Sequence, residues 1–236
     1  MRLAKALAEA GIASRRACER LIVDGEVAVN GQVVHVPYQG VDWERDRVAV
    51  GGKLIRPGVK KRYYAINKPV GYLCSQARLG QQRILADLFP DDGERLFSVG
   101  RLDRATSGLI LATNDGVFAH QVMHPSFGVV KEYLVKVAQE VSHEHLVAMS
   151  QGTPLNGVWV KPLSVNKIRR GTFKISLCEG RKHEVREIVY SADLHLLTLT
   201  RIRIGSLVLG SMAEGSFRSL SQDEIDSFAP KPRKPQ

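Results

Sequence analysis

The chain is poor in cysteine and in long apolar runs. Three of its 236 residues are cysteines, Cys18, Cys74 and Cys178, and they lie far apart and form no CxxC pair. No disulfide framework is therefore expected, and this use of cysteine is typical of a reducing, cytoplasmic environment. No apolar run approaches the ~18 residues that a membrane helix needs, so we expect no membrane partner. The basic start, MRLAKALAEAGIASRR, has no apolar core, and we do not expect a secretory signal there.

Motifs for nucleotide cofactors, hydrolases and metals are also missing. The sequence has no Walker-type GxxxxGK[ST], no GxGxxG fingerprint and no GxSxG elbow, which disfavours ATP, NAD and serine-hydrolase chemistry. His120 and His124 form one histidine pair and His143 and His145 another, but no Cys, Asp or Glu at ligand spacing completes a metal site. We therefore expect the protein to need neither a cofactor nor a metal ion.

Basic residues, by contrast, are in excess. The chain has 34 Lys and Arg against 24 Asp and Glu, a formal net charge of +10, and its 44% hydrophobic fraction is that of an ordinary folded protein. Such a charge fits a polyanionic partner, because each phosphate contact releases counterions. Many basic proteins bind no nucleic acid, so charge alone leaves the partner open.

Residues 1–58 predict a small domain of two short helices and several short strands. Residues 2–10 place small and apolar side chains on one helical face. Ser14 is a natural N-cap for a second helix over residues 15–24. Strands are then expected at residues 26–29, 32–36 and 47–50.

Residues 59–229 predict a larger α+β domain, and the basic, Pro-rich tail 230–236 is expected to be disordered. Strands and helices do not alternate regularly, which argues against a doubly wound parallel sheet. A mostly antiparallel mixed sheet flanked by helices is the better interpretation. The expected strands are 63–67, 108–113, 132–137, 172–177 and 196–200, and the expected helices are 84–88, 117–123, 142–150 and 182–191.

The string LAKALAEAGIASRRACERLIVDGEVAVNG, residues 3–31, resembles the S4 RNA-binding domain in its helix, Gly, Ser-Arg-Arg, helix and VNG turn. Guanidinium groups at helical spacing suit the phosphates of a structured RNA, because Arg binds phosphate oxygens with two parallel N–H groups. A solvated helix face partnered by Glu9 and Glu19 is the alternative interpretation. The resemblance favours RNA binding, by Lys5, Arg15, Arg16 and Arg20.

The segment FSVGRLDRATSGLILATNDG, residues 97–116, places a carboxylate in a turn between two expected strands. Asp103 is flanked by Arg101 and Arg104, and nearby positive charge favours an ionised carboxylate that can act as a nucleophile. A surface aspartate in a salt bridge would explain an isolated RxDR equally well. The segment closely resembles the catalytic motif of ribosomal RNA pseudouridine synthases of the RsuA type, which often carry an S4 domain. This resemblance implies that Asp103 is the essential catalytic residue, and we expect Arg101 and Arg104 to contact RNA.

Three further segments resemble motifs of the same family. KEYLV, residues 131–135, is similar to the family's KxY strand, which implies that Tyr133 packs against the target base, although a strand tyrosine is more often a packing residue. EGRKHEVR, residues 179–186, is similar to the family's EGRxHQVRRM segment, which implies that Arg186 pairs with the catalytic aspartate. LTRIRIG, residues 199–205, resembles its LxRxxIG strand.

The chain departs from the family pattern near Arg186. Glu184 replaces the usual Gln, and Glu187 with Ile188 replaces the usual Arg-Met. Two extra negative charges on the helix that carries Arg186 are expected to weaken RNA docking or to shift target choice.

The resemblance covers nearly the whole chain and implies a site-specific ribosomal RNA pseudouridine synthase that works without a cofactor. The extended region VNGQVVHV…DRVAVGGKLI looks more like the members of the family that act on the large-subunit (23S) RNA than those that act on the small-subunit (16S) RNA. A 16S enzyme and a non-catalytic S4-type ribosome-assembly factor are the alternatives. Ribosomal RNA is the expected partner, and the protein is expected to be a cytoplasmic monomer.

Overall fold

The computed structural model describes residues 1–75, 78, 80–89 and 95–229. The chain forms two compact units, of which the first is Met1–Arg62 with a few later residues and the second is most of the remainder. Each unit has its own hydrophobic core. The predicted tail 230–236 lies outside the described residues.

The first unit pairs two helices with a four-stranded antiparallel sheet. The helices are α1 (Leu3–Glu9) and α2 (Arg15–Val23), and the strand order is β2-β1-β3-β4. Its strands are β1 (Val27–Val29), β2 (Gln32–Val33), β3 (Val48–Val50) and β4 (Lys53–Ile55). The fold class predicted for this part is confirmed, but β2 ends at Val33 rather than at residue 36.

Capping and apolar spacing explain why α2 forms where it does. The Ser14 hydroxyl accepts the N–H of Ala17 at 3.1 Å, which satisfies one of the free N–H groups of the first turn. Cys18 and Ile22, one helical turn apart, are fully buried against Leu7 and Val27. The opposite face of α2 carries charged residues.

The second unit is built on a nine-stranded sheet with the main order β11-β12-β8-β13-β7-β5-β15. All its pairings are antiparallel except a short parallel one between β13 and β7, so the predicted mostly antiparallel mixed sheet is confirmed. Its strands are β5 (Tyr63–Lys68), β6 (Phe97–Val99), β7 (Ser107–Thr113), β8 (Lys131–Val137), β11 (Ser164–Arg169), β12 (Thr172–Leu177), β13 (Leu196–Ile204), β14 (Leu207–Val208) and β15 (Phe217–Ser219).

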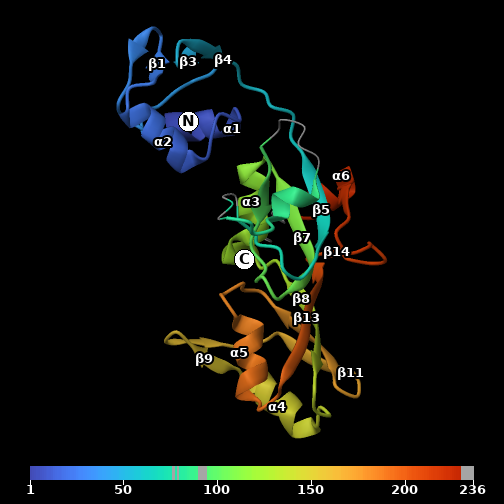
Figure 1. The fold of residues 1–236 in the computed structure, drawn as a ribbon. Helices are drawn as coiled ribbons and strands as arrows, with labels where there is room; N and C mark the ends of the chain where they lie inside the picture. The colour runs from blue at the N-terminus through green and yellow to red at the C-terminus, as the bar shows by residue number, and fades with distance from the viewer. Residues whose placement is uncertain (76–77, 79, 90–94, 230–236) are drawn as a thin grey trace, which may run out of the picture. The chain divides into compact units, whose positions relative to one another are not determined.

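Helices and a small hairpin cover the sheet (Figure 1). The helices are α3 (Gly116–Met123), α4 (His143–Gln151), α5 (Glu184–Ser191) and α6 (Gln222–Asp226), with short 3-10 turns at Leu85–Leu88 and Pro125–Phe127. The hairpin pairs β9 (Thr153–Leu155) with β10 (Val158–Val160) and packs on α5. The helix predicted at 84–88 is thus a single 3-10 turn, and the strand predicted at 196–200 continues to Ile204. Among the described residues, no helix has both the length and the apolar content to cross a membrane.

The central strands β5 and β7 are buried on both faces. Ile66 and Ile110 point into the core under α4 and α5, whereas Ala65 and Leu109 point into the core under α3 and α6. Such strands have continuous apolar runs rather than alternating ones, as ILAT in β7 illustrates. The turn that enters β7 is therefore attached to the most rigid part of the sheet.

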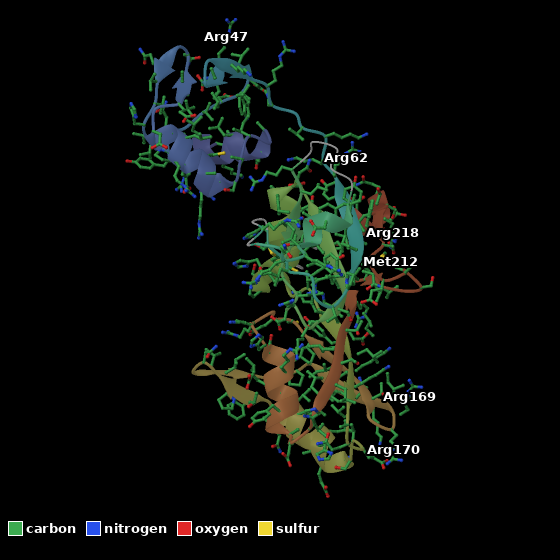
Figure 2. All side chains as sticks on the ribbon, in the orientation of Figure 1. Arg47, Arg62, Arg169, Arg170, Met212 and Arg218 are labelled. Atoms are coloured by element: carbon green, nitrogen blue, oxygen red, sulfur yellow. The ribbon has the colours of Figure 1, made fainter. Side chains whose placement is uncertain are left out.

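An exposed ion pair holds the carboxyl-terminal helix α6, and its contribution to stability can be predicted. Both terminal nitrogens of Arg218, labelled in Figure 2, donate to the Glu224 carboxylate at 2.7 and 2.8 Å. This pairing lowers the pKa of Glu224 to about 2. A carboxyl group whose pKa falls on folding stabilises the protein above its unfolded-state pKa, and this stabilisation is lost as the pH falls through the folded-state value.

We therefore expect Glu224→Gln to lower the free energy of unfolding by about 0.5–1 kcal/mol at pH 7, the range for exposed pairs with good geometry. The difference from wild type should shrink as the pH falls from 4.5 toward 2. Denaturant unfolding at pH 7 and pH 3 measures it, with Asp226→Asn on the same helix as the matched control. A difference that is independent of pH would contradict the ion-pair explanation.

Candidate active site

Asp103 lies in the turn between β6 and β7, and other segments hold the backbone of this turn. The Lys68 ammonium at the end of β5 donates to the Thr106 carbonyl at 2.7 Å, and the N–H of Gly71 donates to the Arg104 carbonyl at 2.7 Å. Lys68 is fully buried, and burial lowers its pKa. The turn therefore presents Asp103 on a preorganised backbone, as a catalytic group requires.

Each oxygen of the Asp103 carboxylate faces a different basic side chain. Oδ2 lies 3.7 Å from Nε of Arg186, and Oδ1 lies 3.6 Å from Nε2 of His183. Arg186 is fixed in turn, because its Nη2 donates to the Ala105 carbonyl and to the Thr106 hydroxyl, both at 3.1 Å. The predicted neighbour of Asp103 thus lies beside it.

The start of α5 places its N-cap residue His183 and its first-turn residue Arg186 next to Asp103. His183 is the N-cap residue of α5 and has a left-handed backbone (φ 62°), which is uncommon for a residue other than glycine. Glu184 is buried, and its carboxylate accepts the N–H of Arg181 at 3.0 Å. Burial raises the pKa of Glu184. This carboxylate ties the segment together, and the expected effect of Glu184 and Glu187 on RNA docking stays a prediction.

The carboxylate opens into a cavity of about 550 Å³, within the range of sites for small organic groups. Tyr133 on β8 lines this cavity and is 8% exposed. Asp103, His183 and Arg186 line it as well. Asp103, Tyr133 and Arg186, which were predicted from three separate motifs, therefore surround one cavity. Arg101 is a further lining residue.

Arg201 on β13 also lines the cavity, and it is buried. It is paired across the strands with Tyr133 on one side and with Gly108 on the other. Its Nε donates to the Leu109 carbonyl at 2.7 Å, and its Nη2 has no hydrogen-bond partner within the part of the chain that the structure describes. Gly108 is required here, because a Cβ at that position would collide with the Arg201 carbonyl oxygen. This close approach lets β7 and β13 pair in parallel.

The predicted RNA-binding residues of the first unit lie on α1 and α2. Lys5 pairs with Glu9 and Arg15 with Glu19, each at 3.6 Å. Arg16 and Arg20 are exposed, and no ion pair is found for either of them among the described residues. They lie on the same side of α2, one helical turn apart, which leaves two guanidinium groups free for a ligand.

The two arginines that flank Asp103 in the sequence do not pair with its carboxylate. Arg101 is exposed at the cavity, whereas Arg104 lines a separate hollow together with Gly71 and Arg83. His183 and Arg186, about 80 positions further along the chain, face the Asp103 carboxylate instead. In a turn, adjacent side chains point in different directions, so sequence adjacency does not place them on one carboxylate.

Three residues described at the site were not predicted as site residues: His183, Lys68 and Arg201. His183 belongs to the EGRKHEVR segment, and its position three residues before Arg186 is the signal that would place both on one side of a helix start. Lys68 follows an apolar strand and precedes Pro69, a pattern that carries no chemical signal by itself. The His120 and His124 rings stack on each other at 4.8 Å, and no cluster of three or more metal-binding side chains occurs among the described residues.

Comparisons with known proteins agree with this arrangement. The S4 domain model matches residues 1–48, and the RNA pseudouridylate synthase model matches residues 62–191. A chloroplast protein of Arabidopsis thaliana, named provisionally as a ribosomal large subunit pseudouridine synthase, is 42% identical over 96% of this chain and 60% of its own length. An uncharacterized RNA pseudouridine synthase of Aquifex aeolicus is 39% identical over 95% of this chain and 92% of its own. A crystal structure of a pseudouridylate synthase superposes with a TM-score of 0.70, at 30% identity, covering 97% of this chain and 99% of the other.

The fold and the cavity define an RNA-modifying enzyme with a separate RNA-binding domain. The chain belongs to the RNA pseudouridylate synthase family and carries an S4 domain at its amino-terminal end.

Proposed function

We propose that this protein converts a specific uridine of ribosomal RNA to pseudouridine, with Asp103 as the nucleophile. The observation that carries the proposal is the Asp103 carboxylate, which opens into a nucleoside-sized cavity between Arg186 and His183. A carboxylate is a side chain that can act as the nucleophile in covalent catalysis. The family and the S4 domain support an RNA substrate.

The reaction is an isomerisation and needs no second substrate. The bond between C1′ of the ribose and N1 of uracil breaks, the freed base turns, and a bond forms between C1′ and C5. The proton on C5 is lost and N1 gains one, so atoms and electrons balance. A carboxylate promotes this exchange by attacking C1′ or by adding to the ring. Release of tritium from ribosomal RNA labelled at uridine C5 tests the proposal, and an active wild-type protein that releases none would refute it.

Tyr133 is proposed to hold the uracil once it has left the RNA stack. Enzymes that act on a base extrude it from its stack and bind it against aromatic side chains. Tyr133 lines the cavity with Asp103, and it is paired across the strands with Arg201, which lines the same cavity. The aromatic ring, rather than the hydroxyl, carries this role.

We therefore expect Tyr133→Phe to keep most of the base contact and Tyr133→Ala to lose it. A stacked base contributes about 1–3 kcal/mol, which corresponds to a roughly 5- to 150-fold loss in kcat/KM for the alanine variant. Single-turnover tritium release measures both variants, and thermal unfolding shows whether Tyr133→Ala still folds. A phenylalanine variant as defective as the alanine variant would contradict the stacking role.

Arg16 and Arg20 are proposed to bind phosphates of the RNA. The double variant Arg16→Ala/Arg20→Ala should weaken RNA binding and reduce the slope of log K against log salt by roughly 1.4–1.8, because each of two phosphate contacts contributes about 0.7–0.9. Arg15→Ala is the matched control on the same helix, since Arg15 already pairs with Glu19 and should contribute less. Binding titrations from about 50 to 300 mM salt measure both. An unchanged slope in the double variant would contradict the assignment.

The large ribosomal subunit is the proposed source of the substrate. The Arabidopsis relative carries that subunit in its name, and the extended region after the Asn30-Gly31 turn looks like the large-subunit type. Mapping pseudouridine by carbodiimide adducts and primer extension, in ribosomes from a strain lacking this protein, identifies the target. We expect a missing modification in 23S RNA. A missing modification in 16S RNA would overturn the choice of ribosomal RNA and leave the reaction unchanged.

A further inference from the structure

His183 occupies a position that the roles of Asp103, Tyr133 and Arg186 do not explain. Its Nε2 lies 3.6 Å from Oδ1 of Asp103, on the opposite oxygen from Arg186, and its ring lines the same cavity. The side chain is 46% exposed, so the ring also reaches solvent. His183 therefore lies between the proposed nucleophile and bulk water.

The backbone of His183 is held in an unfavourable conformation to reach this position. Its φ of 62° is left-handed, which is strained for a residue other than glycine. As the N-cap residue of α5 it makes no side-chain capping bond, although capping is the usual role of a polar side chain there. The His183 carbonyl accepts the N–H of Glu187 at 3.0 Å, and the buried Glu184 carboxylate holds the preceding Arg181 N–H. These hydrogen bonds hold the backbone that places the ring beside Asp103, and the ring itself does not cap the helix.

The reaction requires a group that moves a proton, and Arg186 is unsuited to this. A guanidinium stays protonated in proteins, and Arg186 is also anchored to Ala105 and Thr106. Imidazole is the side chain that both accepts and releases a proton near neutral pH. We propose, on the basis of the function proposed above, that His183 is a catalytic residue that accepts the C5 proton of the repositioned uracil and passes it to water.

The step balances without another reactant. Once the C1′–C5 bond has formed, C5 carries both the ribose and its original hydrogen. An imidazole nitrogen takes this hydrogen as a proton, and the electron pair of the C–H bond restores the ring double bond. As the C5–C6 double bond forms, the π electrons of the N1–C6 double bond move onto N1, which takes a proton from water. The imidazolium releases its proton to water, which returns His183 to its neutral form.

Two variants separate this role from a structural one. Asn is the residue other than glycine that best tolerates a left-handed backbone, so His183→Asn keeps the loop while removing the base. His183→Gly relieves the backbone strain and leaves space that free imidazole can enter from solvent. His143→Gln, an exposed histidine at the start of α4 and outside the cavity, is the matched control. All are measured as the full chain, with ribosomal RNA transcripts carrying protium or deuterium at uridine C5.

His183→Asn should slow single-turnover pseudouridine formation by about 100-fold or more, the usual contribution of general acid–base catalysis. Its deuterium isotope effect should exceed that of wild type, because C5 proton removal becomes the slow step. Added imidazole should accelerate His183→Gly in proportion to its concentration, and His143→Gln should match wild type. A purely structural histidine would change neither the isotope effect nor the response to imidazole.

Other results would overturn the proposal. Wild-type turnover in His183→Asn would contradict the proton role. So would slow turnover of this variant without a larger isotope effect, combined with no imidazole rescue of His183→Gly. Either result would leave the proposed function intact. A larger isotope effect in Tyr133→Phe but not in His183→Asn would assign the proton to the tyrosine hydroxyl instead. Wild-type protein that forms no pseudouridine would overturn the proposed function together with this role.

Discussion

Replacing Asp103 with asparagine is expected to abolish pseudouridine formation while leaving RNA affinity almost unchanged. Asparagine has nearly the same shape and retains one oxygen toward His183 or Arg186, but its amide cannot act as a nucleophile. We expect turnover to fall by at least about 1,000-fold, as is usual when a nucleophile is removed. Tritium release measures turnover, and equilibrium binding to the same RNA measures affinity.

The control for this variant is Asp193→Asn. Asp193 is exposed, lies outside the cavity and has a left-handed backbone (φ 56°) that asparagine adopts readily. The Asp193→Asn variant makes the same chemical change at a site with no role in the reaction, so its turnover should equal that of wild type. An Asp103→Asn variant that releases tritium as fast as wild type would mean that another group does the chemistry.

Replacing Arg186 with alanine is expected to produce the second largest loss. Arg186 faces Oδ2 of Asp103 and also donates to the two residues that close the catalytic turn, so its removal affects both the charge and the position of the carboxylate. Loss of one preorganised charged donor costs about 100- to 1,000-fold in turnover. RNA affinity should change far less, because the main partner of Arg186 is Asp103 rather than a phosphate.

Arg186→Lys tests which of these contacts matters. Lysine keeps the charge but lacks the planar fork that reaches Ala105, Thr106 and Asp103 together, so only partial recovery is expected. Arg169→Ala, at the exposed end of β11 in Figure 2, removes a charge outside the cavity and serves as the control. Full turnover in Arg186→Ala, or a loss confined to RNA affinity, would show that the pairing with Asp103 has no catalytic role.

Local signals in the sequence were enough to predict most of the secondary structure. The second helix of the first unit begins after Ser14 because a hydroxyl there satisfies a free N–H, and this depends only on neighbouring residues. Strands such as β12 were predicted at the residues where they occur, since apolar and β-branched runs are local properties. The strand after residue 196 was predicted too short, because pairing with β8 and β7 extends it through the charged residues Arg201 and Arg203.

Short-range patterns in the sequence determined the two-domain class and most helices and strands, and the family resemblance implied that Arg186 pairs with Asp103. Only the tertiary structure decided the rest of the surroundings of this carboxylate. The adjacent Arg101 and Arg104 do not pair with it, whereas His183, 80 residues away, faces its second oxygen. The buried Lys68 holds the turn that carries Asp103, and the buried Glu184 holds the segment that carries His183. These contacts join distant segments through sheet register and burial, which no local pattern encodes.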